Sequence, residues 1–436
     1  MNILLSSYWR EILSQYEQIH LGFSGGLDST VLLHILTTES RLYNKLHAIY
    51  INHGISCHAD IWQQHCKNIC QQLDVRYTAI KISFKRTSNI EENARFMRYR
   101  TLAKFILTNH CLLTAHHQDD QAETLLLHMA RGTSINGLTG INTTMACGLG
   151  SLHRPLLTVS RKILHDYAIK HQLIWINDDS NDNQKFSRNF IRHQILPLFN
   201  LKWPSINRNL LRSSLLCKQA QTNLNELATI DCPELHLNNN SNSFLSINPL
   251  YKLSAHRLNN VLRYWLQKHT GRIPEYSILN RLQNELIDKN KKSNPQISWK
   301  NYTIHRYQEK LFLLHSLKID NQTSNILWDN FPAPLFFRKT ILIADVALHG
   351  IRILPDQCIE IRFRNGGEHF FWHRQTKTLK KLMQEWRIPP WQRSTIPLLY
   401  IDNQLASIVG YAINDNFYTT QGEHIFKFLL KCQEFT

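Results

Sequence analysis

A glycine pair near the start of the chain has the residue types and spacing of a phosphate site. An apolar run ends in Ser24-Gly25-Gly26-Leu27-Asp28-Ser29, and a helical pattern follows directly. Two glycines let the backbone form a nest of N–H donors, and the positive end of the next helix points to the same place. A carboxylate beside polyphosphate requires a cation between them, so Asp28 is assigned to Mg²⁺. The alternative is an ordinary strand-to-helix turn in which Ser or Asp caps the helix.

A second polar cluster lies where a later apolar run meets another helical pattern. Its sequence is Thr114-Ala115-His116-His117-Gln118-Asp119-Asp120-Gln121-Ala122-Glu123-Thr124. Strand ends in open α/β sheets face the ligand crevice, so this cluster is expected across from the glycine pair. Asp120 and Glu123 share one helix face and can hold an ammonium group or accept its proton. The alternatives are carboxylates that complement the helix dipole, or a metal cluster with the histidines, although neighbouring strand residues point opposite ways.

The elements that must position both clusters alternate between strand and helix. Four apolar runs predict strands at residues 20–24, 46–52, 76–82 and 111–117, and periodic segments at 29–39, 59–73 and 90–109 predict helices. This alternation is typical of βαβ units around a parallel sheet. The first two hundred residues are therefore predicted to form an α/β, doubly wound domain.

The rest of the chain changes pattern twice. From about Leu210 it becomes helical, with amphipathic segments at 248–269 and 276–287, a surface excursion at 235–246 and a hairpin-like stretch at 297–316. After a linker at 318–326, short alternating strands follow at 340–345, 359–364 and 408–413. We predict three domains: a catalytic domain at 1–205, a helical middle domain at 206–320, and a small α+β C-terminal domain at 333–436.

The composition favours a polyanionic partner. The formal net charge is +17 although only 19% of the residues are charged. Such an excess usually indicates nucleic acid, because Lys and Arg neutralise phosphates and release counterions. A basic surface that serves solubility is the alternative.

Cysteine spacing and hydropathy indicate the compartment. The nine cysteines are scattered and none has C-x-x-C spacing, so free thiols are expected, with no disulfide and no metal–thiolate site. Cys66 and Cys70 fall on one amphipathic helix and are expected to be packed or half-exposed. The first residues lack the pattern of a signal peptide, and no apolar run is long enough to span a bilayer. A cytoplasmic protein without membrane contact is therefore expected.

Together the two polar clusters resemble a known family. The glycine motif is neither G-x-x-x-x-G-K-[ST] nor G-x-G-x-x-G; it matches S-G-G-x-D-S of the PP-loop ATP pyrophosphatases, which cleave ATP to AMP and pyrophosphate. Followed by H-H-x-D-D-Q-A-E-T, it resembles the tRNA(Ile)-lysidine synthases, and less closely the tRNA 2-thiocytidine enzymes, whose C-x-x-C cysteines are absent here. Further similar segments are Asn52-His53-Gly54, Glu92-Asn93-Ala94-Arg95 with Arg98-Tyr99, Asp179-Ser180-Asn181 with Arg188-Asn189 and Ile191-Arg192, Arg362-Phe363-Arg364-Asn365-Gly366-Gly367-Glu368, and residues 379–393. One departure is the loop at 131–141, where Thr133 and Ile141 replace an expected small residue and Met.

The resemblance implies a ligase that forms a carbon–nitrogen bond. It would join free L-lysine to C2 of the wobble cytidine in the CAU anticodon of tRNA(Ile), through an adenylated cytidine, and so change codon reading and charging from methionine to isoleucine. ATP and Mg²⁺ are the implied cofactors. The implied ATP-binding residues are Ser24, Gly25, Gly26, Leu27, Asp28 and Ser29, with Asp28 also the metal ligand.

The resemblance also suggests roles for other side chains. Asp120 and Glu123 would bind or deprotonate lysine, and Arg95, Arg98, Arg188 and Arg192 would contact the α-phosphate or the tRNA backbone, unless they only form surface ion pairs. The middle and C-terminal domains would hold the tRNA. Trp372, Trp386 and Trp391 are better explained as core anchors than as base-stacking groups.

Other functions stay open at this point. One is a different PP-loop ligase, such as a tRNA thiolase or an amide-forming synthetase for a small molecule. Another is a catalytically silent RNA-binding protein with the same fold. The sequence leaves open whether the chain dimerises, and it allows a homodimer.

Overall fold

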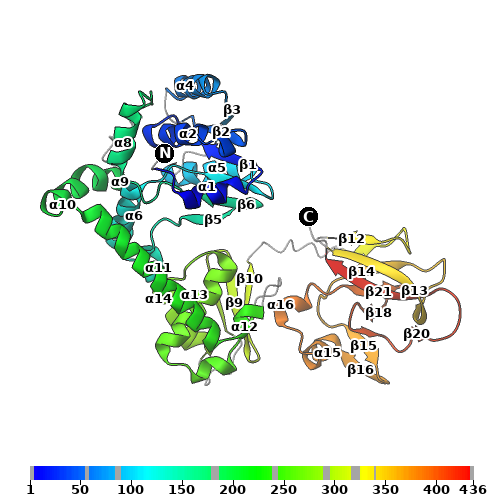
Figure 1. Ribbon diagram of the computed structural model, residues 1–436. Helices are drawn as coiled ribbons and strands as arrows, with labels where there is room; N and C mark the ends of the chain where they lie inside the picture. The colour runs from blue at the N-terminus through cyan, green and yellow to red at the C-terminus, as the bar shows by residue number, and fades with distance from the viewer. Residues whose placement is uncertain are drawn as a thin grey trace. The chain divides into compact units, whose positions relative to one another are not determined.

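The computed structural model describes residues 4–54, 58–83, 90–177, 186–237, 244–287, 295–315, 325–337 and 340–432 of the 436-residue chain. Residue contacts divide the chain into two compact units, Met1–Ile230 and Asp231–Thr436 (Figure 1). The division into three domains at 1–205, 206–320 and 333–436 stays a prediction.

The first unit is built on one sheet of the predicted parallel kind. Its strand order is β3-β2-β1-β4-β6-β5, and only β5 runs antiparallel to its neighbour. The strands are β1 (Gln18–Gly22), β2 (Leu46–Asn52), β3 (Arg76–Lys81), β4 (His110–Leu113), β5 (Thr144–Cys147) and β6 (Gly150–His153). The helices are α1 (Ser7–Ser14), α2 (Leu27–Thr37), α3 (Ser40–Tyr43), α4 (Ala59–Gln72), α5 (Ile90–Ala103), α6 (Gln118–Ala130), α7 (Ile135–Leu138), α8 (Arg161–Lys170), α9 (Ser187–Phe190), the π-helix η2 (Ile191–Ile195), α10 (Leu196–Lys202) and α11 (Ile206–Asp231).

Helices cover both faces of this sheet, so the predicted doubly wound α/β fold is confirmed. On one face, Ile19 and Leu21 of β1 share a core with side chains of α1, α2, α4 and α8. On the other, Ile49 of β2 and Leu112 of β4 pack with Leu102 of α5. Every residue of β2 is buried, which is why its sequence is a continuous apolar run and not an alternation.

Two predicted element ends in the first unit were wrong by several residues. Strand β4 ends at Leu113 and not at residue 117, because the next residues lead into α6 with His117 as its N-cap. Helix α5 ends at Ala103 and not at residue 109, because the carbonyl of Ile106 accepts the N–H of Leu149 from another segment. The hairpin of β5 and β6 was not predicted at all.

A row of three histidines crosses the neighbouring strands β2, β1 and β4 toward the amino-terminal ends of these strands. His20 Nδ1 lies 3.1 Å from Nδ1 of His47, and His20 Nε2 lies 3.2 Å from Nδ1 of His110. The ring of Phe105 lies near His20 and His47. His20 and His47 are buried, and burial together with neighbouring cations, Arg76 among them, lowers the pKa of each to about 4.

The second unit, green to red in Figure 1, combines helices with antiparallel sheets. Its helices are α12 (Glu234–Leu237), the 3₁₀-helix η3 (Asn248–Lys252), α13 (Ala255–Thr270), α14 (Tyr276–Arg281), the π-helix η4 (Leu282–Ile287), α15 (Leu379–Glu385) and α16 (Pro390–Arg393). Its strands are β7 (Phe244–Ser246), β8 (Gln296–Trp299), β9 (Tyr302–Tyr307), β10 (Lys310–His315), β11 (Ile326–Leu327), β12 (Leu335–Phe337), β13 (Thr340–Arg352), β14 (Ile359–Arg362), β15 (His369–Trp372), β16 (Gln375–Thr378), β17 (Leu398–Ile401), β18 (Gln404–Ile408), β19 (Ala412–Ile413), β20 (Tyr418–Thr419) and β21 (Ile425–Cys432). The predicted helical middle and mixed α and β C-terminal parts are both present.

Two readings of the second unit need correction. Residues 244–246 are not part of a surface excursion, because they form β7 and pair with β10; residues 238–243 lie outside the described part. Residues 408–413 are not one strand, because Gly410 takes a positive φ of 82° in a turn between β18 and β19. Most of the proposed linker at 318–326 is also outside the described residues.

Cysteine and membrane predictions concern the whole chain. Seven cysteines are free: Cys66, Cys70, Cys111, Cys147, Cys217, Cys232 and Cys358. Cys66 and Cys70 of α4 are fully buried, which raises the pKa of both thiols. None of the described helices combines the length and apolar character needed to cross a membrane. The cytoplasmic location stays a prediction.

Candidate active site

The glycine motif forms a tight loop between β1 and α2. Gly26 is the N-cap of α2, so no side chain covers the first N–H groups of that helix. Ser29 Oγ donates to the carbonyl of Gly26 and lies 3.1 Å from Ser24 Oγ, so the two hydroxyls brace the turn from inside. The loop therefore offers backbone donors at a helix N-terminus, as an anion site requires.

Gly25 is held in a conformation and a space that only glycine fits. Its φ is +77°, and a Cβ atom there would lie 2.6 Å from Ile176 Cδ1 and 2.7 Å from Cys66 Sγ. The N–H of Ile176 donates to the carbonyl of Gly25 at 2.8 Å. The loop is thus closed from behind by a buried thiol and by a segment from much later in the chain.

His117 connects the two polar clusters. Its Nε2 lies 3.5 Å from Asp28 Oδ2 and 3.5 Å from Asp120 Oδ2. Its Nδ1 accepts the N–H of Asp120, and the Asp120 carboxylate accepts the N–H of His117, which makes a reciprocal cap of α6. The predicted approach of the second cluster to the glycine loop is therefore present, with His117 between the carboxylates.

Carboxylates reverse the effect of burial on His117. Burial alone would lower its pKa, but the hydrogen bond to Asp28 and the charges of Asp120, Asp28 and Asp119 raise it above the usual 6.5. The neighbouring His116 lacks this excess of nearby carboxylates. Burial lowers the pKa of His116 to about 3, although the charge of Asp120 acts to raise it. His116 bonds to Thr114 Oγ1 at 2.9 Å.

Asp120 and Glu123 are held by two arginines from α9 and η2. Arg188 Nε donates to Glu123 Oε2 at 2.7 Å, and Arg188 Nη2 lies 3.0 Å from Asp120 Oδ1. Arg192 Nε donates to Glu123 Oε1 at 2.6 Å and Arg192 also contacts Asp120. The Glu123 side chain is only 1% exposed. These are partly buried, charge-assisted pairs and not the surface ion pairs considered from the sequence.

The same contacts keep the Asp120 carboxylate ionised. Burial opposes its charge, but His117, Arg188 and His116 outweigh that and lower the pKa of Asp120 to about 2. At neutral pH Asp120 is therefore a poor proton acceptor and a good partner for a cation.

The other predicted site residues are placed unevenly. Arg95 is exposed, with its guanidinium over the Tyr99 ring at 5.5 Å, and the arginines that pair with Asp120 and Glu123 are Arg188 and Arg192 instead. Arg98 lies over the same ring. Residues 179–181 lie outside the described part of the chain.

Two residues gained a role that sequence reasoning did not give them. Asp119 accepts the N–H of Arg161 and the Nδ2 of Asn207, both at 2.8 Å, and so joins α6 to α8 and α11. Gln121 accepts the N–H of Ile141 at 2.5 Å, which ties the loop at 131–141, whose sequence differs from the family pattern, to the residue next to Asp120. Both lie inside the quoted motif, and their polar character within a helix start was the available signal.

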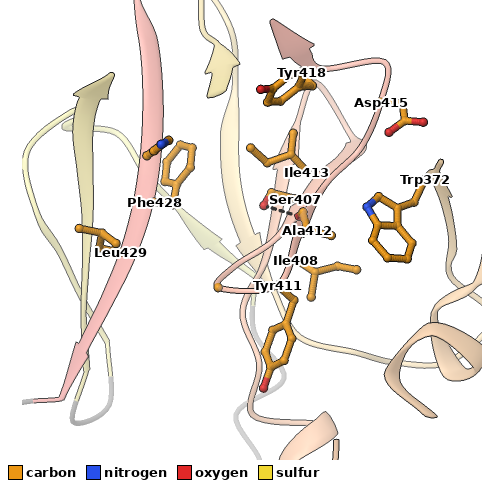
Figure 2. A pocket seen from close by; sticks show the side chains of 12 residues that line it. Trp372, Ser407, Ile408, Tyr411, Ala412, Ile413, Asp415, Tyr418, Phe428 and Leu429 are labelled. Atoms are coloured by element: carbon orange, nitrogen blue, oxygen red, sulfur yellow. Dashed lines mark hydrogen bonds between the residues drawn. The ribbon is translucent and has the colours of Figure 1, made fainter. Parts of the chain in front are cut away.

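The second unit holds a cavity of a different kind, of about 450 Å³. Figure 2 shows Trp372, Tyr411, Tyr418 and Phe428 around it, with Asp415 at its edge. Of the three tryptophans, only Trp372 lines this cavity. Trp386 stacks on Tyr411 at 5.6 Å, and Trp391 packs against His305 at 4.5 Å, as expected for anchors.

Known families match three stretches of the chain. A PP-loop domain family matches residues 4–199, a family described as TilS substrate binding domain matches 245–312, and one described as TilS substrate C-terminal domain matches 359–428. Proteins named tRNA(Ile)-lysidine synthase are similar over nearly the full length. The protein from Legionella pneumophila (strain Lens) is 45% identical over 96% of both chains, and the one from Coxiella burnetii is 37% identical over 91% of this chain and 89% of its own.

Solved structures are more distant. A U34-tRNA thiolase from Methanococcus maripaludis is 16% identical, with a TM-score of 0.41, over 49% of this chain and 75% of its own. A TILS C-terminal domain structure is 18% identical, with a TM-score of 0.21, over 26% of this chain and 99% of its own. These likenesses are too small to support a conclusion.

Proposed function

This chain belongs to the tRNA(Ile)-lysidine synthase family, and from that premise we propose that it joins free lysine to C2 of the wobble cytidine in the CAU anticodon of tRNA(Ile). It is a ligase with an ATP-using PP-loop domain and a tRNA substrate. The observation that carries the finer proposal is His117, which contacts both Asp28 of the phosphate loop and Asp120 of the carboxylate pair. Nucleotide cleavage and amine attack would thus occur side by side.

The proposed reaction has two steps. First, the C2 oxygen of the cytosine attacks the α-phosphorus of ATP, and pyrophosphate leaves with the bonding electrons. The N–H groups of the loop at residues 24–29 stabilise that leaving group. Then the ε-amine of lysine, as the neutral amine, attacks C2, the bond from C2 to the oxygen of AMP breaks, AMP leaves with the bonding electrons, and the proton lost by the amine passes to water. The first step matters because the C2 oxygen of cytosine is a poor leaving group by itself and a good one once it is part of AMP.

Magnesium fits beside Asp28. Asp28 Oδ1 is buried and has no hydrogen-bond partner among the described residues, while Oδ2 faces His117. No group of three His, Cys, Asp or Glu side chains in the described part is arranged to hold a metal. An ion on Asp28 would therefore complete its coordination with phosphate oxygens and water, as Mg²⁺ commonly does. When bound, it would neutralise charge on the leaving pyrophosphate.

Asp120 and Glu123 are proposed to bind the lysine side chain as a pair, with Asp120 in contact with it and the buried Glu123 acting through Arg188 and Arg192. Asp120 stays ionised at neutral pH, so it suits an ammonium group better than a free proton. Arg188 and Arg192 hold both carboxylates in place. We propose that the same two arginines also bring positive charge to the α-phosphate. In this proposal the arginines orient the carboxylates and Arg95 contacts the substrate from α5.

The decisive experiment measures lysine transfer. The purified protein is incubated with Mg²⁺, ATP and radiolabelled lysine, and with either tRNA(Ile) bearing CAU or tRNA(Met) with the same anticodon. Label should enter only tRNA(Ile), with AMP and pyrophosphate released in equal amounts. Pyrophosphate release without lysine transfer would instead favour another PP-loop ligase.

Basic residues at 374–393 are proposed to hold the tRNA backbone. Arg374, Lys380, Lys381 and Arg387 are exposed, whereas Lys377 pairs with Glu385 and Arg393 is buried against the carbonyl of Ile388. Replacing the four exposed residues with Gln should reduce the salt slope of tRNA binding by about 0.9 for each lost phosphate contact. Arg281→Gln is the control, because Arg281 already pairs with Glu285. An unchanged slope would remove this segment from the interface.

A further inference from the structure

Besides the cavity in the second unit, the first unit has a hollow of its own, which adjoins the phosphate loop. It has a volume of about 550 Å³, within the roughly 300–1,000 Å³ of typical small-ligand sites. Its lining residues are Leu27, Asp119, Arg161, Lys162, His165, Trp175 and Asn177. Ser24, Gly25, Gly26 and Ser29 are not among them, so the hollow lies beside the loop that would hold pyrophosphate and not within it.

The lining of this hollow carries positive charge that the described protein does not neutralise. Arg161 and Lys162 begin α8, and neither side chain has an ion-pair partner among the residues that the structure describes. The one acidic lining residue, Asp119, already accepts the backbone N–H of Arg161 and the side chain of Asn207. Asp119 and the N-cap Ser160 already accept N–H groups at the start of α8, so the side chains of Arg161 and Lys162 are what makes the hollow suit an anion.

An aromatic side chain accompanies these charges. Trp175 is half-buried, and its Nε1 donates to Asn177 Oδ1 at 3.1 Å. His165 packs edge-on against it at 5.9 Å. The single donor of the indole is thus used inside the protein, and what Trp175 can still offer a ligand is its ring. Cations beside an aromatic ring are the usual means of binding unpaired nucleotides.

We propose that this hollow binds the unpaired nucleotide next to the modified cytidine, with its phosphate at Arg161 and Lys162 and its base on Trp175. This inference rests on the proposed function, because it takes the RNA as the substrate. Leu27 directly precedes Asp28, and Asp119 Oδ2 lies 3.7 Å from His117 Nδ1. A base at the reaction centre therefore places its chain neighbour within reach of the hollow, and holding that neighbour keeps the target base out of the stack.

The test compares steady-state constants of three variants. Arg161→Gln combined with Lys162→Gln should raise the KM for tRNA about tenfold and leave the KM for ATP unchanged, and Trp175→Leu should do the same, because one stacked base is worth roughly 5- to 150-fold. Trp175→Phe keeps a ring and should restore most of the affinity. Arg161→Gln keeps the bond to Asp119, because that bond comes from its backbone N–H.

Controls separate this inference from misfolding and from the function itself. Lys170→Gln changes a basic residue in the last turn of the same helix and should leave tRNA affinity unaltered. All variants should melt within a few degrees of the parent chain. An unchanged KM for tRNA in the double variant, or a raised KM for ATP instead, would overturn the inference. If the parent chain transferred no lysine to tRNA at all, the proposed function would fail first, and this inference would fall with it.

Discussion

In the first unit, buried histidines lie near both ends of the parallel strands, and their pKa values are shifted in opposite directions. At the carboxyl edge, His117 lies among Asp28, Asp119 and Asp120, and its pKa is raised. At the amino edge, His20 and His47 lie against each other and near Arg76, and the pKa of each is lowered to about 4. Burial opposes the charged form at both ends. The difference shows that neighbouring carboxylates, and not depth of burial, decide in which direction a histidine pKa is shifted.

The largest expected effect comes from removing charge at the carboxyl edge. Asp28→Asn should lower lysine transfer about 10³-fold, because the buried Oδ1 would no longer hold a cation beside the phosphates. Transfer of radiolabelled lysine at saturating tRNA measures it. Asp74→Asn, at an exposed position after α4, is the control. Near-normal transfer by Asp28→Asn would place the cation elsewhere.

The next effect concerns the paired ions beside His117. Glu123→Gln leaves Arg188 and Arg192 partly buried without their main anion, which should lower the free energy of unfolding by about 3–5 kcal/mol and also reduce lysine transfer. Urea unfolding followed by circular dichroism measures the stability. Glu285→Gln breaks an exposed pair with Arg281 and should change little. Equal stabilities of the two variants would contradict the assigned burial of charge.

The amino edge should make the fold sensitive to acid. Between about pH 4 and 6.5, the unfolded chain binds protons at His20 and His47 that the folded chain excludes, so the free energy of unfolding falls as the pH falls through that window. Each histidine accounts for roughly 2–3 kcal/mol at the acidic end. His20→Gln should remove its share of the loss between pH 7.5 and 4.5.

A matched variant sharpens this test. His58→Gln alters an exposed histidine before α4 and should leave the pH dependence as it is. If His20→Gln and the parent chain lost the same stability on acidification, the histidine row would be charged or open in the native state.

The smallest effect has the opposite sign with pH. The raised pKa of His117 contributes stability below its unfolded value near 6.5 and loses it as the pH rises through the folded value. His117→Asn keeps a side-chain cap for α6, so it should cost on the order of 1 kcal/mol at pH 6 and less at pH 9. Thermal unfolding at both pH values tests this, with His58→Asn as the control. A larger cost at pH 9 would reverse the assignment.

What could be predicted from the sequence was mostly local. The glycine loop and the carboxylate pair each lie within a few residues, and strand ends on a parallel sheet meet at one edge, so their approach followed from pattern alone. The partners of Glu123 did not follow, because Arg188 and Arg192 reach it only through the packing of α9 and η2 on α6. The strand β5 was missed because its exposed residues, such as Met145, lack apolar alternation, although Gly148 and Gly150 mark the turn.

The bond between Ile176 and Gly25 has a consequence for synthesis on the ribosome. The phosphate loop occurs early in the chain, yet the segment that closes it from behind is made much later, after all six strands of the sheet. At about 5–20 residues per second, the nascent chain carries an unfinished loop for roughly 10 seconds or longer. A truncated chain that ends before residue 173 would contain the complete glycine motif but would lack the hydrogen bond from Ile176 that closes the phosphate loop. Nucleotide binding should thus begin only once the first unit is nearly complete.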